Sequence, residues 1–339
     1  TLTRSSAASD VYKRQGDILI YGCNLAGSEA GQSLIDELGA LTLTDVAAST
    51  DLTGQGGDWD LEYRAGTIEA AVAVSDDMQA SYGGALALAP DGSNELINET
   101  TTDVQKNVDI DLFADGSYVA VWESLNAGTD EDINLRILNA DGTEKVTETR
   151  VNQTTAVQQL DPAVAVSSNG NFVVTWTNFN GNMDVYARVY DANGVAQTNE
   201  FLVNSAYTTG EQYNTAVAID DSGNFVVTWQ GEGTGDADGI FAQRYDSGGN
   251  PIGTVFLVND TTTTSGQIDP AIAMSGSGAF VITWTDQSAG DIRISAQQYT
   301  AAGVGQGEFV VHATANSGQG EQESSVAMDD SGNFVVTWA

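Results

Sequence analysis

The chain contains one cysteine and one histidine, the two residue types that a thiol-dependent peptidase combines. Cys23 follows the apolar run Ile18–Tyr21 and precedes a segment with helical spacing. A helix amino terminus lowers the pKa of a thiol and raises its reactivity. The nucleophile also needs a base, but His312 stands far along the chain, where other repeats carry asparagine. Cys23 is therefore a catalytic candidate without its partner, and the chain by itself is predicted not to be an enzyme.

A second set of candidates consists of aspartates that recur at one place in successive repeats. Carboxylates two positions apart, as in "DADG" at 236–239, allow alternate oxygens to converge on one calcium ion. The candidate ligands are Asp132, Asp184, Asp236, Asp238 and Asp291. Aspartates that bond their own backbone in turns explain the recurrence at least as well. Calcium therefore stays open as a cofactor, and no other cofactor is indicated.

Tryptophan recurs with the same period. Five motifs of the type "GNFVVTW" end at Trp122, Trp176, Trp229, Trp284 and Trp338, and successive tryptophans lie 54, 53, 55 and 54 residues apart. Exposed rings at such positions would serve as stacking platforms for sugars, which makes a carbohydrate-binding array one alternative. Their position inside apolar strands favours a role as core anchors.

The elements that must position these residues are short strands. Each period of about 54 residues has four apolar runs, separated by turn signals such as "DANG" at 191–194. Asp, Asn and Gly tolerate the positive φ that tight hairpins need. The runs are rich in Val, Ile, Phe, Tyr, Thr and Trp, and none has helical spacing. The sequence predicts a mainly β fold of tandem four-stranded repeats.

The pattern within one strand indicates how the repeats pack. In "NFVVTW", Phe225, Val227 and Trp229 point to one face and Val226 points to the other, so both faces are apolar. A strand of this kind is covered on both sides, as are the inner strands of radially packed propeller blades. We therefore expect a partial β-propeller, with an open β-solenoid and a string of sandwich modules as the alternatives.

Composition restricts the partners. The 339 residues include 47 acidic and 11 basic side chains, and the formal net charge is −36. Nucleic acids and anionic membrane surfaces require basic protein surfaces, so both are excluded as partners. No apolar run is long enough for membrane insertion, and one cysteine permits no internal disulfide. The composition suits an acidic extracellular protein, with surface glycans or other cell-surface proteins as partners.

The chain is expected to have three parts. Residues 1–15 show no periodicity and are predicted to be non-native or linker sequence. Residues 16–86 are predicted to be a truncated α/β domain in which strands flank a helix that begins near Ser28. Residues 87–339 form the repeat array, which is expected to be cut off within its last repeat. Because no initiating methionine is present, we expect an internal piece of a longer protein.

Two resemblances extend this interpretation. The strings "GDILIYGCNLA", "AAST" and "GGDWDLEY" within residues 16–82 resemble the carboxyl half of a domain of unknown function from giant bacterial surface adhesins. That family is similar to the caspase fold, which implies a self-processing Cys–His peptidase with a "SHG" motif upstream of Cys23. The strings "GNFVVTW", "RYD" and "FLVN" within residues 88–339 resemble a repeat of large secreted bacterial proteins. That second resemblance implies a scaffold.

The function expected from the sequence is a structural or adhesive repeat region of a large secreted or cell-surface bacterial protein, supported by calcium if the recurrent aspartates bind it. Two alternatives stay open. The first is a remnant of the Cys–His self-processing peptidase, and the second is a carbohydrate-binding propeller.

Overall fold

The computed structural model describes residues 18–20, 32–33, 35–36, 46–48, 53–54, 63–65, 85–86, 96–102, 104–125, 130–261, 263, 266–287, 292–311 and 323–338. The chain divides into two compact units, Thr1–Asn94 and Glu95–Ala339. The division falls slightly beyond the boundary expected after residue 86. Within the described residues, no helix has the length and hydropathy needed to cross a membrane.

The first unit contains short strands and a helical segment. Its strands are β1 (Ile18–Ile20), β2 (Val46–Ala48), β3 (Thr53–Gly54), β4 (Tyr63–Ala65) and β5 (Ala85–Leu86). β1 pairs in parallel with β2, which pairs antiparallel with β4, and β3 pairs with β5. Residues 32–33 and 35–36 are helical, and Ile35 is buried. A helix between two parallel strands is the α/β arrangement expected here.

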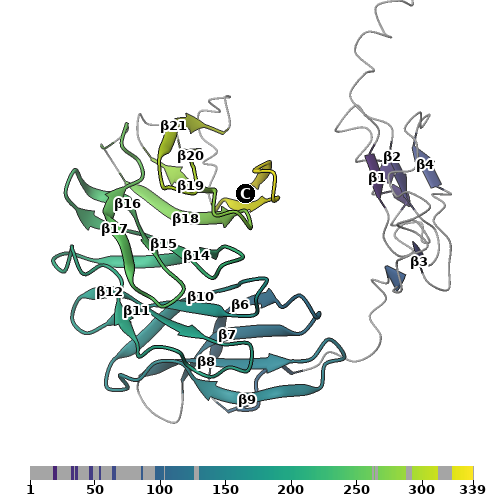
Figure 1. The fold of residues 1–339 in the computed structure, drawn as a ribbon, viewed down its shortest axis with the longest axis horizontal. Helices are drawn as coiled ribbons and strands as arrows, with labels where there is room; N and C mark the ends of the chain where they lie inside the picture. Colours follow the sequence, from purple (N-terminus) through teal and green to yellow (C-terminus); the bar gives the residue numbers. More distant parts are fainter. Residues whose placement is uncertain are drawn as a thin grey trace, which may run out of the picture. The chain divides into compact units, whose positions relative to one another are not determined.

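The second unit is built from antiparallel sheets that follow chain order. Blade 1 is β6 (Gln105–Leu112), β7 (Tyr118–Leu125), β8 (Glu131–Leu138) and β9 (Glu144–Arg150). Blade 2 is β10 (Gln158–Val166), β11 (Phe172–Phe179), β12 (Met183–Tyr190) and β13 (Phe201–Leu202). In Figure 1 the sheets follow one another from the blue blade 1 to the yellow carboxyl end.

Three further blades complete this unit. Blade 3 is β14 (Gln212–Ile219), β15 (Phe225–Gly233), β16 (Asp236–Tyr245) and β17 (Pro251–Leu257). Blade 4 is β18 (Gln267–Met274), β19 (Phe280–Asp286), β20 (Arg293–Tyr299) and β21 (Gly305–Val310). In the described residues, blade 5 consists of β22 (Ser325–Met328) and β23 (Phe334–Thr337).

The first strand of each blade lies innermost. β6 packs beside β10, β10 beside β14, β14 beside β18, and β18 beside β22, so that these strands surround one axis. The other strands of each blade extend outward in order, which is the arrangement of propeller blades. The predicted fold class, tandem four-stranded repeats with a propeller-like fold, is confirmed.

Burial on both faces of the second strand fixes the order of the blades. Phe225, Val227 and Trp229 of β15 pack into the cluster shared with blade 2. Val226, between them in the sequence, packs into the cluster shared with blade 4. The same division holds in β11, where Val174 faces blade 1 and Val173 faces blade 3. Each blade therefore buries apolar area against both neighbours, as the two-faced pattern predicted.

Tight hairpins join the first and second strands. Gly170 adopts a φ of +88°, and a Cβ atom at this position would lie 2.9 Å from the Cβ of Ala192. Both the backbone conformation and the close approach therefore require glycine. The equivalent glycines of the other blades, Gly116, Gly223, Gly278 and Gly332, have φ values between +82° and +89°. This requirement explains the glycine that opens every "GNFVVTW" motif.

Carboxylates also link blade 1 to blade 2. The Val164 backbone N–H donates to Asp109 Oδ2 at 2.8 Å, and the Val166 N–H donates to Asp111 Oδ2 at 2.7 Å. Burial raises the pKa of both carboxyl groups above the ordinary range, although the two donated bonds act in the opposite direction. The buried environment of both aspartates therefore disfavours their charged forms.

This raised pKa predicts an unusual pH dependence of stability. A carboxyl group whose pKa is higher in the folded state stabilises the fold below its unfolded pKa and loses that contribution as the pH rises through the folded value. The midpoint of thermal unfolding is therefore expected to rise as the pH falls from 7 toward about 5, still above the ordinary aspartate pKa of about 4. Thermal melts of the full chain at a series of pH values measure this.

The variant Asp109→Asn should respond less to pH than the parent chain, because it removes one of the two titrating groups. Asp238→Asn, which changes an exposed carboxylate, serves as the control and should keep the full response. Equal responses in both variants would assign the effect to the overall negative charge and contradict a specific role for Asp109.

Candidate functional site

Five residues near the axis share a rare backbone conformation. The inner strands of blades 1 to 4 each carry one non-glycine residue with positive φ, and a fifth lies just before β22: Asn107 (51°), Asp161 (48°), Asn214 (50°), Asp269 (53°) and Glu323 (55°). We call these residues the axial ring. In blades 1 to 4 they stand where the register between the first and second strands shifts, that is, at a β-bulge.

The left-handed conformation costs energy for any residue with a Cβ atom, although Asn and Asp tolerate it best. These are the only non-glycine residues with positive φ in the described part of the chain. A strained conformation that recurs at one site is a feature of functional positions, and bulges often re-aim side chains next to such sites. The axial ring is therefore a better candidate site than any isolated residue.

The ring residues line a pocket at the axis. Its volume is 360 Å³, within the range of about 300–1,000 Å³ typical of small-molecule sites. Each blade contributes its ring residue and the residue that follows it, which are Val108, Pro162, Thr215, Pro270 and Ser324. The described lining includes the carboxyl groups of Asp161, Asp269 and Glu323 and no lysine or arginine. The pocket is thus acidic and is shared by all five blades.

Hydrogen bonds join the ring residues in pairs. Asn107 Nδ2 donates to Asp161 Oδ1 at 3.1 Å, across the boundary between blades 1 and 2. Asn214 Nδ2 donates to Asp269 Oδ1 at 3.0 Å, across the boundary between blades 3 and 4. These amide–carboxylate pairs hold each aspartate in place and leave part of its acceptor capacity for a ligand.

A buried carboxylate supports the first pair from behind. Glu123 on β7 is almost fully buried, and its Oε1 accepts bonds from Asn107 Nδ2 at 2.6 Å and from the Asp161 N–H at 2.7 Å. Lys106 Nζ lies 3.1 Å from Glu123 Oε2 and compensates its charge. A buried charge that is paired and hydrogen-bonded fixes its neighbours strongly. Glu123 is therefore a positioning residue for the ring.

Gln230 takes the same place in blade 3. Its Oε1 accepts from Asn214 Nδ2 at 3.3 Å and from the Asp269 N–H at 3.4 Å. These bonds are longer than those of Glu123, and the acceptor is neutral. The second pair is therefore held by the same geometry with less electrostatic support.

The two ring aspartates have perturbed acidity. Burial raises the pKa of Asp161, and the nearby charge of Glu123 raises it further against the opposing effect of Lys106. Burial likewise raises the pKa of Asp269, with a further contribution from the charge of Glu323. Both carboxyl groups therefore keep their protons to a higher pH than ordinary aspartates do. Perturbed carboxyl groups gathered in a pocket are typical of functional sites.

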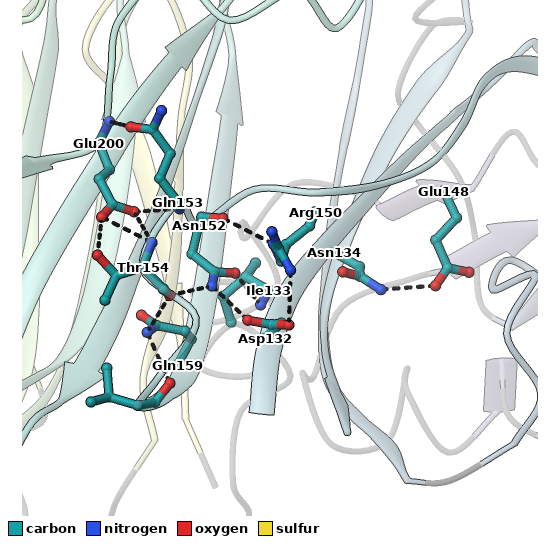
Figure 2. A network of polar contacts seen from close by, with 11 residues as sticks. Asp132, Ile133, Asn134, Glu148, Arg150, Asn152, Gln153, Thr154, Gln159 and Glu200 are labelled. Carbon is teal, nitrogen blue, oxygen red and sulfur yellow. Dashed lines mark hydrogen bonds and ion pairs between the residues drawn. The ribbon is translucent and has the colours of Figure 1, made fainter. Parts of the chain in front are cut away.

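The aspartates proposed from the sequence lie elsewhere, at the blade boundaries. Figure 2 shows Asp132 facing Asn152, whose Nδ2 donates to Asp132 Oδ1 at 2.6 Å. Asn204 and Asp184 repeat this contact at 2.7 Å, and Asn259 and Asp236 repeat it at 2.7 Å. In each case the asparagine Oδ1 also accepts a backbone N–H from the third strand of the blade, at 2.8–2.9 Å. We call each of these contacts an Asn–Asp clasp.

The clasp is continued by neighbouring groups. Asn152 Nδ2 also donates to the Thr154 carbonyl at 2.8 Å, and the same carbonyl accepts from Gln159 Nε2 at 3.2 Å. Glu200 of blade 2 receives the Gln153 and Thr154 backbone N–H groups, at 2.6 and 3.2 Å, together with the Thr154 hydroxyl (Figure 2). This carboxylate holds the end of the outer strand of blade 1 against blade 2.

These contacts give the recurrent aspartates a structural role. Asp238 is exposed, and its N–H donates to Asp236 Oδ1 at 3.1 Å, as in an aspartate turn. Among the residues that the structure describes, no group of three or more His, Cys, Asp or Glu side chains is gathered around a metal position. Asp291 and Cys23, with His312, lie outside the described residues. Calcium binding and a catalytic Cys23 therefore stay predictions.

Three of the five repeated tryptophans are core anchors, whereas Trp338 is 38% exposed. Trp176, Trp229 and Trp284 are fully buried. Trp176 Nε1 donates to Gln159 Oε1 at 2.8 Å, and Trp229 Nε1 donates to Gln212 Oε1 at 2.8 Å, so their polar atoms are satisfied inside the blades. These three rings have no face open for sugar stacking.

The sequence contained a signal for the axial ring that went unused. Every ring residue stands fifteen positions before the tryptophan of its blade, from Asn107 and Trp122 to Glu323 and Trp338. The positions alternate between Asn and Asp and end in Glu, so no fixed letter marks them. Proline follows two of them, at Pro162 and Pro270, and a proline within an inner strand indicates a bulge.

Comparison with known proteins gives one family match. A family described as a domain of unknown function, DUF4347, matches residues 4–86. The match includes most of the first fifteen residues, whose non-native origin stays a prediction. No curated protein matches the chain in sequence. The caspase-like character of this segment and its peptidase activity are not addressed by the match.

Several solved structures are similar to this chain at low sequence identity. An α-L-arabinanase of Penicillium chrysogenum complexed with arabinobiose has a TM-score of 0.48 and 12% identity, over 69% of this chain and 74% of that one. The GH93 α-L-arabinofuranosidase of Fusarium graminearum with arabinobiose gives 0.49 and 10%, over 72% and 78%. An endo-arabinase of Bacteroides thetaiotaomicron gives 0.41 and 16%, over 72% and 92%.

One sequence-based prediction, that the chain is not an enzyme, is contradicted by these findings. It rested on the missing histidine partner of Cys23 and considered no other site. The three solved structures named above are an arabinanase, an endo-arabinase and an arabinofuranosidase, all of which are glycoside hydrolases. These similarities assign no reaction to this chain. However, the missing histidine partner of Cys23 does not show that the chain lacks every enzymatic activity.

The Asn–Asp clasp yields a stability prediction. Asn204 is fully buried, and its loss in Asn204→Ala leaves Asp184 Oδ1, the Val185 N–H and the Tyr207 carbonyl without their partner. We expect the free energy of unfolding to fall by about 2–4 kcal/mol. The matched variant Asn193→Ala changes an exposed turn residue and should stay within about 0.5 kcal/mol of the parent. Urea denaturation measures both, and equal effects would contradict the role of the clasp.

Proposed function

We propose that the axial pocket binds a carbohydrate and that the repeat array is a glycan-binding propeller. The observation that carries this proposal is the convergence of five polar ring residues from five blades on one 360 Å³ pocket. Sugar hydroxyls both donate and accept hydrogen bonds. The pocket offers mainly acceptors, the carboxyl oxygens of Asp161, Asp269 and Glu323, to which sugar hydroxyls can donate. The two Nδ2 hydrogens of Asn107 and of Asn214 are already used in bonds that hold the ring in place.

The charge of the pocket indicates the kind of glycan. Three carboxyl groups line the pocket, and the described lining brings no lysine or arginine to balance them. The formal net charge of the whole chain is −36. An anionic sugar would be repelled at short range and during approach. The ligand class supported best is a neutral glycan with several free hydroxyl groups.

The wider biological role follows from this binding. A propeller that binds neutral glycans from an acidic surface suits the extracellular or cell-surface location proposed from composition. Glycan binding would also give the adhesive role expected from the sequence a physical basis, since the repeat array would be the adhesive element itself. Location and adhesion both belong to the proposal and depend on the pocket.

Binding can be tested with the full chain on an array of neutral and acidic glycans. Neutral oligosaccharides should be retained and sialylated ones should not. Asp161→Asn should weaken binding by about 10- to 150-fold, because a charged acceptor is worth roughly 1.5–3 kcal/mol. Glu232→Gln changes an exposed carboxylate outside the pocket and should leave affinity unchanged. Failure to retain any neutral glycan, or equal affinity for all three chains, would overturn the proposal.

A second candidate function at the same pocket is hydrolysis of the bound glycan. The observation that favours it is the pair of carboxyl groups with raised pKa, because glycoside hydrolysis requires one protonated and one ionised carboxyl group. The charge of Glu323 raises the pKa of Asp269 beyond the effect of burial, which makes Asp269 the candidate for the protonated group.

Hydrolysis can be measured as the release of reducing ends from the neutral glycans that bind. The rate should fall as the pH rises through the raised pKa of the acid, because a general acid must carry its proton. Asp269→Asn should lower the rate about 100-fold or more, whereas Glu232→Gln should not change it. Release that is equal in Asp269→Asn and the parent chain would come from another site or a contaminant.

A further inference from the structure

Tyr213 lies beside the axial pocket and is the one aromatic residue at its position in the repeat. It directly precedes the ring residue Asn214 on β14, close to the start of that strand at Gln212. The positions that precede the other ring residues carry Lys106, Leu160, Ile268 and Gln322. The Tyr213 side chain is half-buried, so part of its ring is in contact with solvent. The rim of the pocket at blade 3 is therefore chemically unlike the rim at the other blades.

The hydroxyl group of Tyr213 is connected to the axial ring through Gln230. Gln230 Nε2 donates to the Tyr213 hydroxyl at 2.8 Å, while Gln230 Oε1 accepts from the Asn214 amide and the Asp269 N–H. The hydroxyl oxygen is the acceptor in this contact. Its own proton has no acceptor among the described residues, so the group can donate to a ligand at the pocket rim.

The surroundings of Tyr213 keep that proton in place. Burial raises the pKa of the Tyr213 hydroxyl above its ordinary value. The charges of Asp238, Asp269 and Glu211 raise this pKa further, against the opposing hydrogen bond described above. Because an ordinary tyrosine with a pKa of about 10 is already protonated at neutral pH, this hydroxyl stays a donor there.

A hydrogen-bond donor is the group that the axial pocket lacks. Carboxyl oxygens dominate its lining, and the amide hydrogens of Asn107 and Asn214 are used within the ring. Sugar hydroxyls can donate to these oxygens, but a glycosidic oxygen carries no hydrogen and can only accept. Glycosidic oxygens link one sugar unit to the next. The Tyr213 hydroxyl therefore suits the linkage between a sugar in the pocket and a second unit.

The surface beyond Tyr213 follows the boundary between blades 3 and 4. Asp238 of blade 3 is exposed, and its charge acts on Tyr213. Gly266 precedes β18 of blade 4, and a Cβ atom at this position would lie 2.7 Å from Asp238 Oδ2. Glycine thus lets the carboxylate lie against the blade 4 backbone. An aromatic ring with an exposed carboxylate nearby offers a sugar both an apolar surface and acceptors for its hydroxyls.

The equivalent position in blade 1 is occupied by an ion-paired lysine. Lys106 Nζ lies 3.1 Å from Glu123 Oε2 and 3.0 Å from Glu131 Oε1. This flexible side chain has no flat face for a sugar ring, and its charge is engaged with two carboxylates. A glycan that extends out of the pocket is therefore better accommodated at blade 3 than at blade 1.

We infer that Tyr213 forms a subsite for a second sugar unit beside the axial pocket, so that the ligand is a neutral oligosaccharide of at least two units. This inference rests on the proposed glycan binding and specifies where the glycan runs, over the boundary between blades 3 and 4. The ring carboxyl groups hold the first unit, the Tyr213 hydroxyl donates to the linking oxygen, and the Tyr213 ring packs against the second unit.

Isothermal titration calorimetry of the full chain tests the subsite. The probes are the neutral oligosaccharide that the glycan array retains best, its terminal disaccharide and its terminal monosaccharide. The parent chain should bind the disaccharide about fivefold or more tightly than the monosaccharide, because the second unit adds a hydrogen bond and an aromatic contact. The longer oligosaccharide should bind at least as tightly as the disaccharide.

Tyr213→Phe removes only the hydroxyl group and keeps the aromatic ring. Affinity for the disaccharide should fall about two- to tenfold, because one neutral hydrogen bond is lost. Affinity for the monosaccharide, which occupies the axial pocket alone, should not change. Tyr186→Phe is the matched control, since Tyr186 is also half-buried but belongs to the third strand of blade 2 and does not line the pocket. It should leave both affinities unchanged.

The possible results distinguish the subsite from the glycan site itself. A chain that binds no neutral glycan loses the proposed function and the subsite with it. If neutral glycans bind but the disaccharide gains nothing over the monosaccharide, the proposed function stands and the subsite is wrong. Equal losses for both probes in Tyr213→Phe would also overturn the subsite, because Tyr213 would then act only by holding Gln230 and the ring.

Discussion

The structure depends on strands that bury both of their faces. In each blade the second strand directs Phe, Val and Trp toward one neighbour and a single Val toward the other, so neither side can be left in water without loss. A blade of this kind is not a stable unit by itself. The requirement for a neighbour on each side explains why the repeats are arranged around an axis and why the ends of the series expose apolar surface.

Polar side chains satisfy the buried backbone groups that apolar packing leaves without hydrogen-bond partners. In blades 1 to 3, an asparagine that follows the outer strand accepts a backbone N–H of the third strand, and an aspartate near the start of that strand accepts from its amide. A buried amide or carboxylate without its partner is costly, so the two residues depend on one another. The recurrence of aspartate that suggested calcium has this second physical cause, although the two are not exclusive.

The spacing of the tryptophan motifs and the alternation of apolar and polar residues were sufficient to predict the repeat and its four strands. This is because the burial of one or both faces of a strand determines which positions are apolar. The two-faced "NFVVTW" strand even distinguished a propeller from a sandwich, as Val226 and Val227 lie in different clusters. The axial ring could not be found in this way. Its residues differ from blade to blade, and their shared property is a left-handed backbone at a bulge, which depends on the pairing of two strands.

The recurrent aspartates proposed as calcium ligands have a structural role that the sequence pattern did not reveal. A residue type that recurs at one position suggests a functional site. In a repeat protein, however, such recurrence also follows from structural contacts that each repeat makes. Asp132, Asp184 and Asp236 form the same Asn–Asp clasp in blades 1, 2 and 3, which accounts for their recurrence. A site that binds a ligand in one orientation does not need the same residue from all five blades. Its residues are therefore expected to differ around the axis.

The ring residues differ in this manner. Asn107 with Asp161 and Asn214 with Asp269 form two amide–carboxylate pairs, while Glu323 brings a further negative charge close to Asp269. The supporting residues differ as well, since Glu123 is charged and Gln230 is neutral. The nearly identical blades thus enclose a pocket in which two neighbouring carboxyl groups, Asp269 and Glu323, come from adjacent blades. Only such an asymmetric arrangement can hold a ligand in a single orientation, because a symmetric ring would accept it equally in five.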